Sequence, residues 1–358
     1  MSLFKSTQNC IGFDIGTTSI KAVELQRLKG KPVLVNYGYS EEVVDFSKPS
    51  FNLDVQKTVR IIAELRKRTG IASGNAVAAM PSFAVFSSVL NLRDSAKAEM
   101  ENAVMWEAKK VIPLALTEMI LDWKIIDEGE AAGTTTARGA TSVKRNVKVL
   151  LTGAPRSLVK KYIAIFKEAK LRLVSLETEM FSLIRSLVGT DPSVVAIVDL
   201  GAVNTDIAII ENGLPVFIRT LDIGGMMVTK AVSESLKVSF QRAEQFKFDL
   251  SLGGPSENSA AGLPKVIADT VSSIINEIRY SLNVYQQENN KRIEKIVLSG
   301  GGANLINIAG YLSKELDMNV VVGDPWARVS YPLDLKAALL ETGPRLAIAV
   351  GLALRETL

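Results

Sequence analysis

The sequence predicts an α/β protein of two duplicated lobes, with a small α+β subdomain inserted into the first. The main observation is a short device that occurs twice, at 14–19 and at 199–205: an apolar run, then Asp, an aliphatic residue, Gly, and small hydroxyl or amide residues. Each copy continues into a second β-rich run, which indicates strand, tight turn and strand. A segment of different character, 84–173, lies between the copies. A chain of 358 residues is also too long for one core.

The other elements follow from hydrophobic periodicity and turn residues. In the first lobe we expect strands at 11–15, 20–26, 33–42 and 75–80, and a helix over 55–69. In the insert we expect strands at 83–92, 119–126 and 147–154, helices over 95–111 and 156–169, and a loop at 129–142. Between the lobes we expect a helix over 178–187. In the second lobe we expect strands at 194–199, 206–210, 217–223 and 292–298, and helices over 228–236, 240–249, 266–287, from about 305 to 316, and 344–354.

These elements divide the chain into consecutive parts. They are the first lobe's core (1–83), the inserted subdomain (84–173), a hinge helix with a return to the first lobe (174–195), the second lobe's core (196–235), its helical subdomain (236–292), and the rest of that core with a second hinge helix (293–358).

Composition excludes several kinds of chemistry. The chain has no His, which removes Ser-His-Asp triads and imidazole acid–base catalysis. Its one cysteine, Cys10, excludes a disulfide framework and a cysteine zinc site. The net charge of +4 is too small to indicate nucleic acid as a partner. We expect no signal peptide and no apolar run near the ~20 residues that span a bilayer, and therefore a cytoplasmic protein.

The two turns have the chemistry of a phosphate clamp. Gly16 and Gly201 permit positive φ and let backbone N–H groups approach a ligand. The small residues that follow add donors: Thr17, Thr18, Ser19, Asn204 and Thr205. An aspartate at each strand end, Asp14 and Asp199, can hold a hydrated divalent cation, because Mg²⁺ keeps its waters and needs only one or two carboxylates. Two such turns facing each other would hold a polyphosphate from both sides.

A third Gly-rich turn follows the strand at 292–298. Gly300, Gly301 and Gly302 come next, then Asn304 and a helix, whose first N–H groups would make an anion or nucleotide site. It is not the dinucleotide fingerprint, since Leu305 stands where that motif needs Gly. A merely structural turn is the alternative.

In this order, the elements resemble the actin-like ATPase superfamily, so the expected fold class is the actin-like ATPase fold. Residues 12–21 and 198–213 resemble its two phosphate motifs and residues 297–304 its adenosine motif. The resemblance implies ATP and Mg²⁺ as ligands and Lys21 as a phosphate contact. It further implies that Glu244 and Lys247 embrace the nucleoside. Glu179 is the best match for the residue that orients water, with Glu177 as an alternative.

Within that superfamily the chain resembles the type IV pilus assembly proteins of the PilM family. The similar stretches are 11–16, 106–113, 121–123, 222–225 and 349–355. The resemblance implies a nucleotide-binding scaffold, at most a slow ATPase, that lies on the cytoplasmic face of the inner membrane through its partners. It would bind the N-terminal segment of PilN within the pilus alignment complex; contact with pilus motor ATPases and self-association stay open. The alternatives are a small-molecule kinase of the same fold and a membrane-associated filament protein like FtsA.

Overall fold

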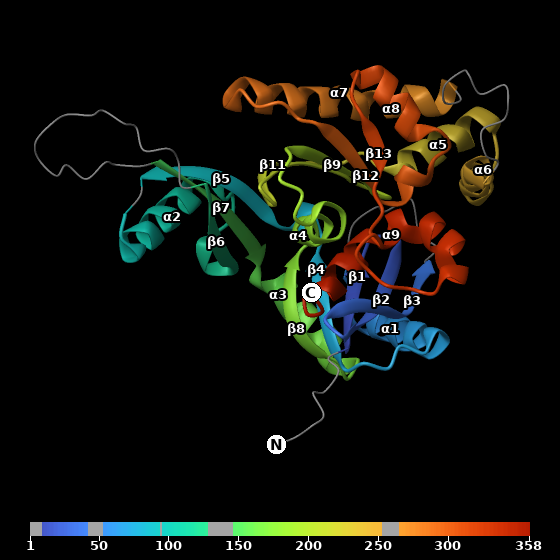
Figure 1. Ribbon diagram of the computed structural model, residues 1–358, viewed down its shortest axis with the longest axis horizontal. Helices are drawn as coiled ribbons and strands as arrows, with labels where there is room; N and C mark the ends of the chain where they lie inside the picture. The colour runs from blue at the N-terminus through green and yellow to red at the C-terminus, as the bar shows by residue number, and fades with distance from the viewer. Residues whose placement is uncertain (1–8, 42–52, 94, 128–145, 253–264) are drawn as a thin grey trace, which may run out of the picture.

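The computed structural model describes residues 9–41, 53–93, 95–127, 146–252 and 265–358. They form two similar lobes and a smaller unit beside them (Figure 1). The lobe 1 sheet has the strand order β3-β2-β1-β4-β8, and the lobe 2 sheet has the matching order β11-β10-β9-β12-β13. In each sheet the first strand is antiparallel to the next one in sequence and parallel to its other neighbour. The two lobe sheets therefore match strand for strand, which confirms the expected duplication, although their last strands, β8 and β13, were not expected from the sequence.

The strands of lobe 1 are β1 (Asn9–Ile15), β2 (Ser19–Leu28), β3 (Lys31–Glu41), β4 (Asn75–Met80) and β8 (Arg172–Thr178). Those of lobe 2 are β9 (Val195–Leu200), β10 (Thr205–Glu211), β11 (Leu214–Leu221), β12 (Lys295–Ser299) and β13 (Val320–Val322). Its helices are α5 (Gly225–Leu236), α6 (Phe240–Leu252), α7 (Lys265–Asn289) and α8 (Ile308–Leu316). Apolar side chains alternate between the two faces of β1, so each lobe sheet is covered by helices on both sides.

One face of the lobe 1 sheet is covered by α1 (Val55–Thr69) and α3 (Arg156–Glu168). Asp54 caps α1, since its side chain accepts a hydrogen bond from the N–H of Lys57, and Gly70 ends that helix with φ of 72°. Buried Tyr162, Ile165 and Phe166 of α3 share a core cluster with β1 and β4. The expected subdomain range 84–173 thus includes a helix that packs on lobe 1.

The smaller unit has its own core. Its antiparallel sheet has the order β5-β7-β6, formed by β5 (Phe86–Arg93), β6 (Met119–Asp127) and β7 (Asn146–Pro155). The helix α2 (Lys97–Val111) covers one face through Met100, Val104 and Ala108. The loop expected at 129–142 lies outside the described residues. Because β7 continues directly into α3, this unit is joined to the helix layer of lobe 1.

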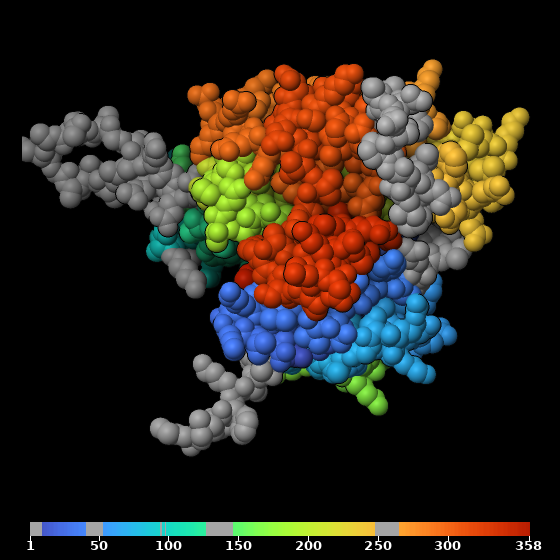
Figure 2. Space-filling model, turned by 45° about the vertical axis from the view of Figure 1, so that its right-hand side comes forward, coloured from blue at the N-terminus to red at the C-terminus, as the bar shows by residue number. Residues whose placement is uncertain are grey.

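Two hinge helices lie between the lobes. The helix α4 (Glu179–Leu183) continues as a π-helical turn (Ile184–Val188), and α9 (Lys336–Leu354) closes the chain. Both pack into a cluster that joins β1 and β4 to β9 and β10. In Figure 2 the red α9 lies between the orange lobe 2 and the blue lobe 1. A Cβ on Gly351 would lie 1.9 Å from the carbonyl oxygen of Ser182, so only glycine permits this helix crossing.

The sequence expectations for α9 were wrong in two respects. The helix begins at Lys336 and contains Pro344 in its interior, whereas a proline was expected to open it. The Pro344 carbonyl accepts hydrogen bonds from the Gly300 N–H at 3.0 Å and the Ser299 hydroxyl at 3.4 Å, which ties this point of the helix to lobe 2. Second, no apolar run of this kind was expected, yet by length and composition one described stretch, Leu333–Leu354, is apolar enough to cross a membrane; 67% of its 18-residue apolar window is buried inside the protein.

Candidate nucleotide site

A cleft of about 750 Å³ opens between the two lobes, and both lobes contribute to its walls. Lobe 1 supplies the turn after β1, lobe 2 supplies the turn after β9 and the Gly-rich turn after β12, and α6 and α9 complete the lining. The cleft contains sixteen of the residues expected to form the site: Asp14, Gly16, Thr17, Thr18, Ser19, Lys21, Glu179, Asp199, Gly201, Asn204, Glu244, Lys247, Gly300, Gly301, Gly302 and Asn304. Thr205 is the exception. Its buried hydroxyl donates to the carbonyl of Ile223 at 2.7 Å.

The two turns have the same backbone geometry. The Gly16 N–H donates to the Ser19 carbonyl at 3.0 Å, and the Gly201 N–H donates to the Asn204 carbonyl at 2.9 Å. A Cβ would lie 3.2 Å from that oxygen at Gly16 and 2.8 Å from it at Gly201. Neither glycine has positive φ, so that part of the expectation is wrong. At Gly201 a side chain would force the turn to open, whereas at Gly16 it would make a tight contact with the same carbonyl of the turn.

In the first turn the aspartate is neutralised by a lysine. Asp14 lies opposite Lys21 in the register of β1 and β2, and the Lys21 ammonium lies 2.7 Å from an Asp14 carboxylate oxygen. Asp14 is almost fully buried, whereas Lys21 keeps 16% of its side chain exposed. A lysine held in this way presents its remaining donors to the cleft.

In the second turn the aspartate faces another aspartate. Asp199 lies opposite Asp206 in the register of β9 and β10, and both are buried. Burial and the charge of Asp206 raise the pKa of Asp199 to about 7. Burial also raises the pKa of Asp206 to about 6, although a hydrogen bond from Thr220 opposes that shift. Two carboxylates placed together in this way favour a bound cation.

Glu179 brings a fourth carboxyl group to the cleft, beside Asp14, Asp199 and Asp206. It accepts hydrogen bonds from the Ser82 N–H at 2.8 Å and the Ser82 hydroxyl at 3.1 Å. Burial, followed by the charges of Asp206 and Asp14, raises the pKa of Glu179 well above its ordinary value. Glu179 is therefore close enough to feel the carboxylate charges of both turns.

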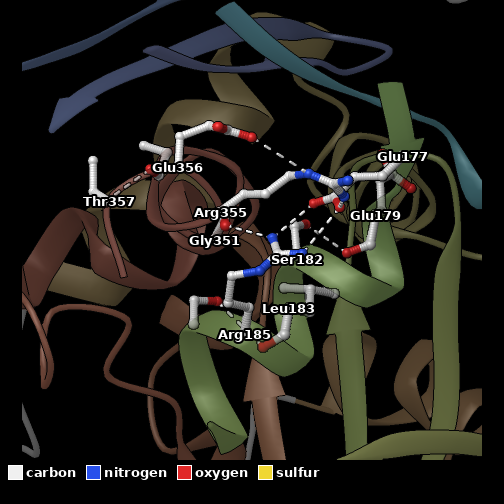
Figure 3. A network of polar contacts seen from close by, with 11 residues as sticks. Glu177, Glu179, Ser182, Leu183, Arg185, Gly351, Arg355, Glu356 and Thr357 are labelled. Carbon is white, nitrogen blue, oxygen red and sulfur yellow. Dashed lines mark hydrogen bonds and ion pairs between the residues drawn. The ribbon is translucent and has the colours of Figure 1, made fainter. Parts of the chain in front are cut away.

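Glu177, the alternative for the water-orienting role, belongs to the hinge (Figure 3). It accepts hydrogen bonds from Arg185 at 2.7 and 3.0 Å and from Arg355 at 2.6 Å. Arg185 also donates to the Gly351 carbonyl at 2.6 Å. Glu177 thus joins β8, the π-helical turn and the end of α9, and it is absent from the lining of the cleft.

The acidic end of the cleft fits a hydrated magnesium ion. Asp199 has a buried oxygen, Oδ1, without a hydrogen-bond partner among the described residues. Nowhere among the described residues do three potential ligands lie close enough together to bind an ion directly. Mg²⁺ usually keeps several waters and takes one or two carboxylates, which suits Asp14 and Asp199 on opposite walls.

Beside the second turn the cleft is lined by α5 and α6, and the Gly225 N–H of α5 donates to the Gly201 carbonyl at 2.9 Å. The Lys247 ammonium lies 2.8 Å from a Glu244 oxygen, 2.8 Å from the Thr229 hydroxyl and 3.2 Å from the Gly225 carbonyl. The Thr229 hydroxyl donates to the same Glu244 oxygen. These contacts hold α6 against the N-terminus of α5, so the expected nucleoside pair is positioned by lobe 2 alone.

The third turn differs from its expected form. Gly301–Asn304 is a single 3₁₀ turn, and α8 begins only at Ile308, so the glycines do not open an α-helix. Gly300 has φ of 79°, and a Cβ there would lie 2.5 Å from the Leu200 carbonyl oxygen and 2.9 Å from Asp199 Oδ1. The Asn304 amide donates to the Glu341 carbonyl of α9 at 2.9 Å. This turn therefore packs against the second phosphate turn and α9.

Several lining residues were not expected from the sequence, among them Asp206, Tyr39, Gln241, Gln245 and Arg345. A signal for Asp206 exists, since it follows Asp199 by the seven residues that separate Lys21 from Asp14. No local pattern marks Arg345, whose guanidinium lies 4.7 Å from the ring centre of Tyr39 across the mouth of the cleft.

Comparisons with known proteins agree with this geometry. A family model described as "Type IV pilus assembly protein PilM" matches residues 12–357. The cell division protein FtsA of Streptococcus pneumoniae is 22% identical over 309 residues, which cover 76% of this chain and 66% of that relative. The solved structure of a PilM-PilN type IV pilus biogenesis complex superimposes with a TM-score of 0.82 at 23% identity, covering 99% of this chain and 100% of the other. MreB5 of Spiroplasma citri bound to ADP superimposes with a TM-score of 0.52 at 15% identity, covering 98% and 96%.

Proposed function

The chain belongs to the type IV pilus assembly protein PilM family, and from this premise we propose that it is a cytoplasmic, ATP-binding scaffold of the inner-membrane pilus complex. In this proposal it binds the cytoplasmic N-terminal segment of PilN, and its conformation depends on nucleotide. The observation that carries the proposal is the cleft itself. Its two walls present matching glycine turns, one with a lysine and the other with two carboxylates.

In this proposal, different residues of the cleft contact the phosphates, the nucleoside and the metal of a bound Mg-ATP. The turns at Gly16 and Gly201 and the Lys21 ammonium would hold the phosphates, whereas Glu244 and Lys247 would hold the nucleoside. Asp14 and Asp199 would hold waters of the metal, which when bound neutralises phosphate charge. A similarly folded protein, MreB5 of Spiroplasma citri, was solved with ADP, which supports a nucleotide in this cleft.

We propose that hydrolysis is slow or absent. The chain has no His, and Glu179 is the best-placed carboxylate for orienting water. Its raised pKa would keep part of it protonated, which weakens it as a hydrogen-bond acceptor for water. A turnover number near the enzyme median of ~10 per second would favour a kinase-like or other catalytic function instead.

The inserted subdomain is the proposed site of PilN. In its three-stranded sheet β5 and β6 are both edge strands, which can accept an added strand from an extended peptide. Exposed apolar side chains lie along β6, at Ile120 and Ile125, and on α2, at Trp106. The solved relative that contains PilN supports this partner.

The same subdomain contacts both lobes, which gives nucleotide a means to act on it. It continues into α3 of lobe 1, and the Lys148 ammonium of β7 lies 2.9 Å from Asn289 Oδ1 at the end of α7 in lobe 2. A ligand that binds the closed form of the lobes better shifts the population toward it. Closure would then change the position of the subdomain against lobe 2, and with it the affinity for PilN.

The test is the affinity for a synthetic PilN N-terminal peptide, measured by calorimetry with and without Mg-ATP. We expect Mg-ATP to change the peptide affinity, and the peptide to change the ATP affinity by the same factor, because linkage is reciprocal. Equal affinities in both pairs of measurements would end the switch proposal and leave nucleotide a structural ligand.

A matched pair of substitutions locates the peptide. Ile120→Asp on β6 should weaken the peptide by at least about ten-fold. Val321→Asp on β13 is the matched control, because Val321 is 38% exposed and Ile120 is 40% exposed. It should leave the peptide affinity unchanged, because β13 belongs to the lobe 2 sheet. If both variants bind the peptide with equal affinity, PilN does not bind at the β6 edge of the sheet.

A further inference from the structure

The outer face of lobe 1 is formed by α1 and α3, and it is strongly basic. Their buried sides pack together on the sheet through Ile62, Leu65, Ile165 and Phe166. The Gln56 amide also donates to a Glu168 carboxylate oxygen at 2.7 Å, which joins the two helices at the surface. Their outward sides therefore belong to one continuous helical layer. In Figure 2 α1, drawn in light blue, lies at the lower surface of the molecule.

The charge of this layer exceeds the charge of the whole chain. Between Asp54 and Thr69 and between Arg156 and Arg172 there are eleven basic and three acidic residues, a net of +8. The complete chain carries +4, so all remaining residues sum to −4. The positive charge of the protein is thus concentrated on one face of one lobe, whereas elsewhere acidic residues predominate.

Most of these cations are turned to solvent. The exposed ones without an ion pair among the described residues are Arg60, Lys67, Arg68, Lys160, Lys161, Lys167, Lys170 and Arg172. Salt bridges inside the protein therefore do not explain why they are gathered there. Elsewhere in the described chain, lysines such as Lys21, Lys247 and Lys295 lie beside carboxylates.

An exposed aliphatic side chain lies among the lysines of α3. Ile163 is 53% exposed, and Lys160 and Lys167, three residues before and four after it, share its side of the helix. The aromatic residues of α3, Tyr162 and Phe166, are both buried, so this helix exposes no aromatic ring that could stack on nucleic-acid bases. An apolar side chain surrounded by basic ones is typical of surfaces that lie on a lipid headgroup layer.

We propose that the α1–α3 face docks directly on an anionic membrane surface, with its lysines and arginines at the phosphate headgroups and Ile163 at the acyl boundary. Anionic leaflets attract each nearby Lys or Arg additively, so a face of eight unpaired cations gains far more than scattered charges do. The proposal goes beyond the proposed scaffold function, in which the protein reaches the membrane only through a partner. It requires no PilN and no nucleotide.

The experiment is co-sedimentation of the full chain with unilamellar vesicles, without PilN. We expect binding to vesicles of phosphatidylglycerol and phosphatidylcholine in equal parts, no binding to pure phosphatidylcholine, and loss of binding at high salt. Lys160→Gln, Lys161→Gln and Lys167→Gln in one protein should lower the partition coefficient about five-fold per lysine, on the order of 100-fold altogether.

The control removes the same charge from lobe 2. Lys230→Gln, Lys265→Gln and Lys314→Gln change exposed lysines on α5, α7 and α8, and should leave vesicle binding within about two-fold of the wild-type protein. Equal losses in both triple variants, or equal binding to neutral vesicles, would overturn the proposal. Binding to a DNA duplex without binding to vesicles would also overturn it. ATP and PilN-peptide affinities of the α3 variant should be unchanged, so failure here is distinguishable from failure of the proposed function.

Discussion

The two phosphate turns share their strands, their glycine and their closing hydrogen bond, but they differ at one position. Opposite Asp14 in the sheet register stands Lys21, whereas opposite Asp199 stands Asp206. In the first turn this gives an ion pair at 2.7 Å. In the second it gives two buried carboxyl groups whose pKa values rise to about 7 and about 6. The same backbone therefore carries a neutral pair in one lobe and an uncompensated acidic pair in the other.

This difference assigns unlike roles to like structures. A lysine that remains partly exposed beside its carboxylate can donate to an anion. Two carboxylates in low-dielectric surroundings instead favour a cation, or a proton in its absence. A ligand that satisfies both turns must be negative toward lobe 1 and positive toward lobe 2, and a metal-bound polyphosphate meets that requirement.

The largest effect is expected when the cation of the first turn is removed. Lys21→Ala should weaken ATP by about 3 kcal/mol, roughly 100-fold, because the phosphates lose a charge-assisted donor and Asp14 is left unpaired. Calorimetric titration of ATP measures this, and Lys31→Ala, at an exposed position on β3, is the matched control. If ATP binds both variants equally well, Lys21 does not contact phosphate.

A smaller effect is expected when a carboxylate of the second turn is removed, and this change should raise the stability of the ligand-free protein. A carboxyl group with a raised pKa binds its proton more tightly when folded, so stability falls as pH rises from its unfolded pKa, about 4, through its folded pKa. For Asp206 that loss extends to about pH 6, and for Asp199 to about pH 7. Asp206→Asn should therefore stabilise the protein by about 1 to 2 kcal/mol above pH 7.

Thermal unfolding of wild-type protein and Asp206→Asn across this pH range checks the sign. The melting temperature of the wild-type protein should fall from about pH 5 to about pH 7, and the variant should show a flatter profile. Asparagine can still accept the hydrogen bond from Thr220, so packing is preserved. A variant that is less stable than the wild-type protein at every pH would contradict this prediction.

The smallest effect on ATP affinity is expected for Glu244 and Lys247, which lie on α6 of lobe 2. Changing Glu244 and Lys247 together to Ala should weaken ATP by about 1 kcal/mol and leave inorganic triphosphate unchanged, since in the proposal these residues hold the nucleoside and not the phosphates. Competition of both ligands against a fluorescent nucleotide gives the two affinities. A loss of the same factor for ATP and triphosphate would contradict the nucleoside assignment.

The duplication could be predicted because it depends on local patterns. An apolar strand that ends in Asp-x-Gly fixes a turn by its own residues, and sixteen of the expected site residues do line the cleft. Thr205 was misplaced because the strand β10 begins at that residue, and its side chain points to the β11 end instead. The pairing of Asp199 with Asp206 depends on register between strands, which the turn spacing alone encodes only indirectly.

Features set by contacts between distant segments were beyond prediction. Pro344 is tolerated inside α9, where its carbonyl accepts hydrogen bonds from Ser299 and Gly300 of lobe 2. Glu177 was the alternative for the water-orienting carboxylate, but Arg185 and Arg355 both donate hydrogen bonds to it in the hinge. The partners Ser299, Gly300 and Arg355 lie more than forty residues away, so no local pattern contains them.

The acidic second turn is tested most directly by titrating ATP into wild-type protein and Asp199→Asn near pH 8, with Mg²⁺ and with a chelator. Mg-ATP should bind the variant at least about ten-fold more weakly, because the carboxylate that orders metal-bound water is gone. Metal-free ATP should bind the variant as well as the wild-type protein or better, because a negative charge facing the phosphates has been removed. Asp14→Ala should likewise weaken Mg-ATP far more than metal-free ATP. Loss of both ligands by one factor, or unchanged Mg-ATP affinity in Asp199→Asn, would contradict the role of Asp199 in holding the metal of a bound Mg-ATP.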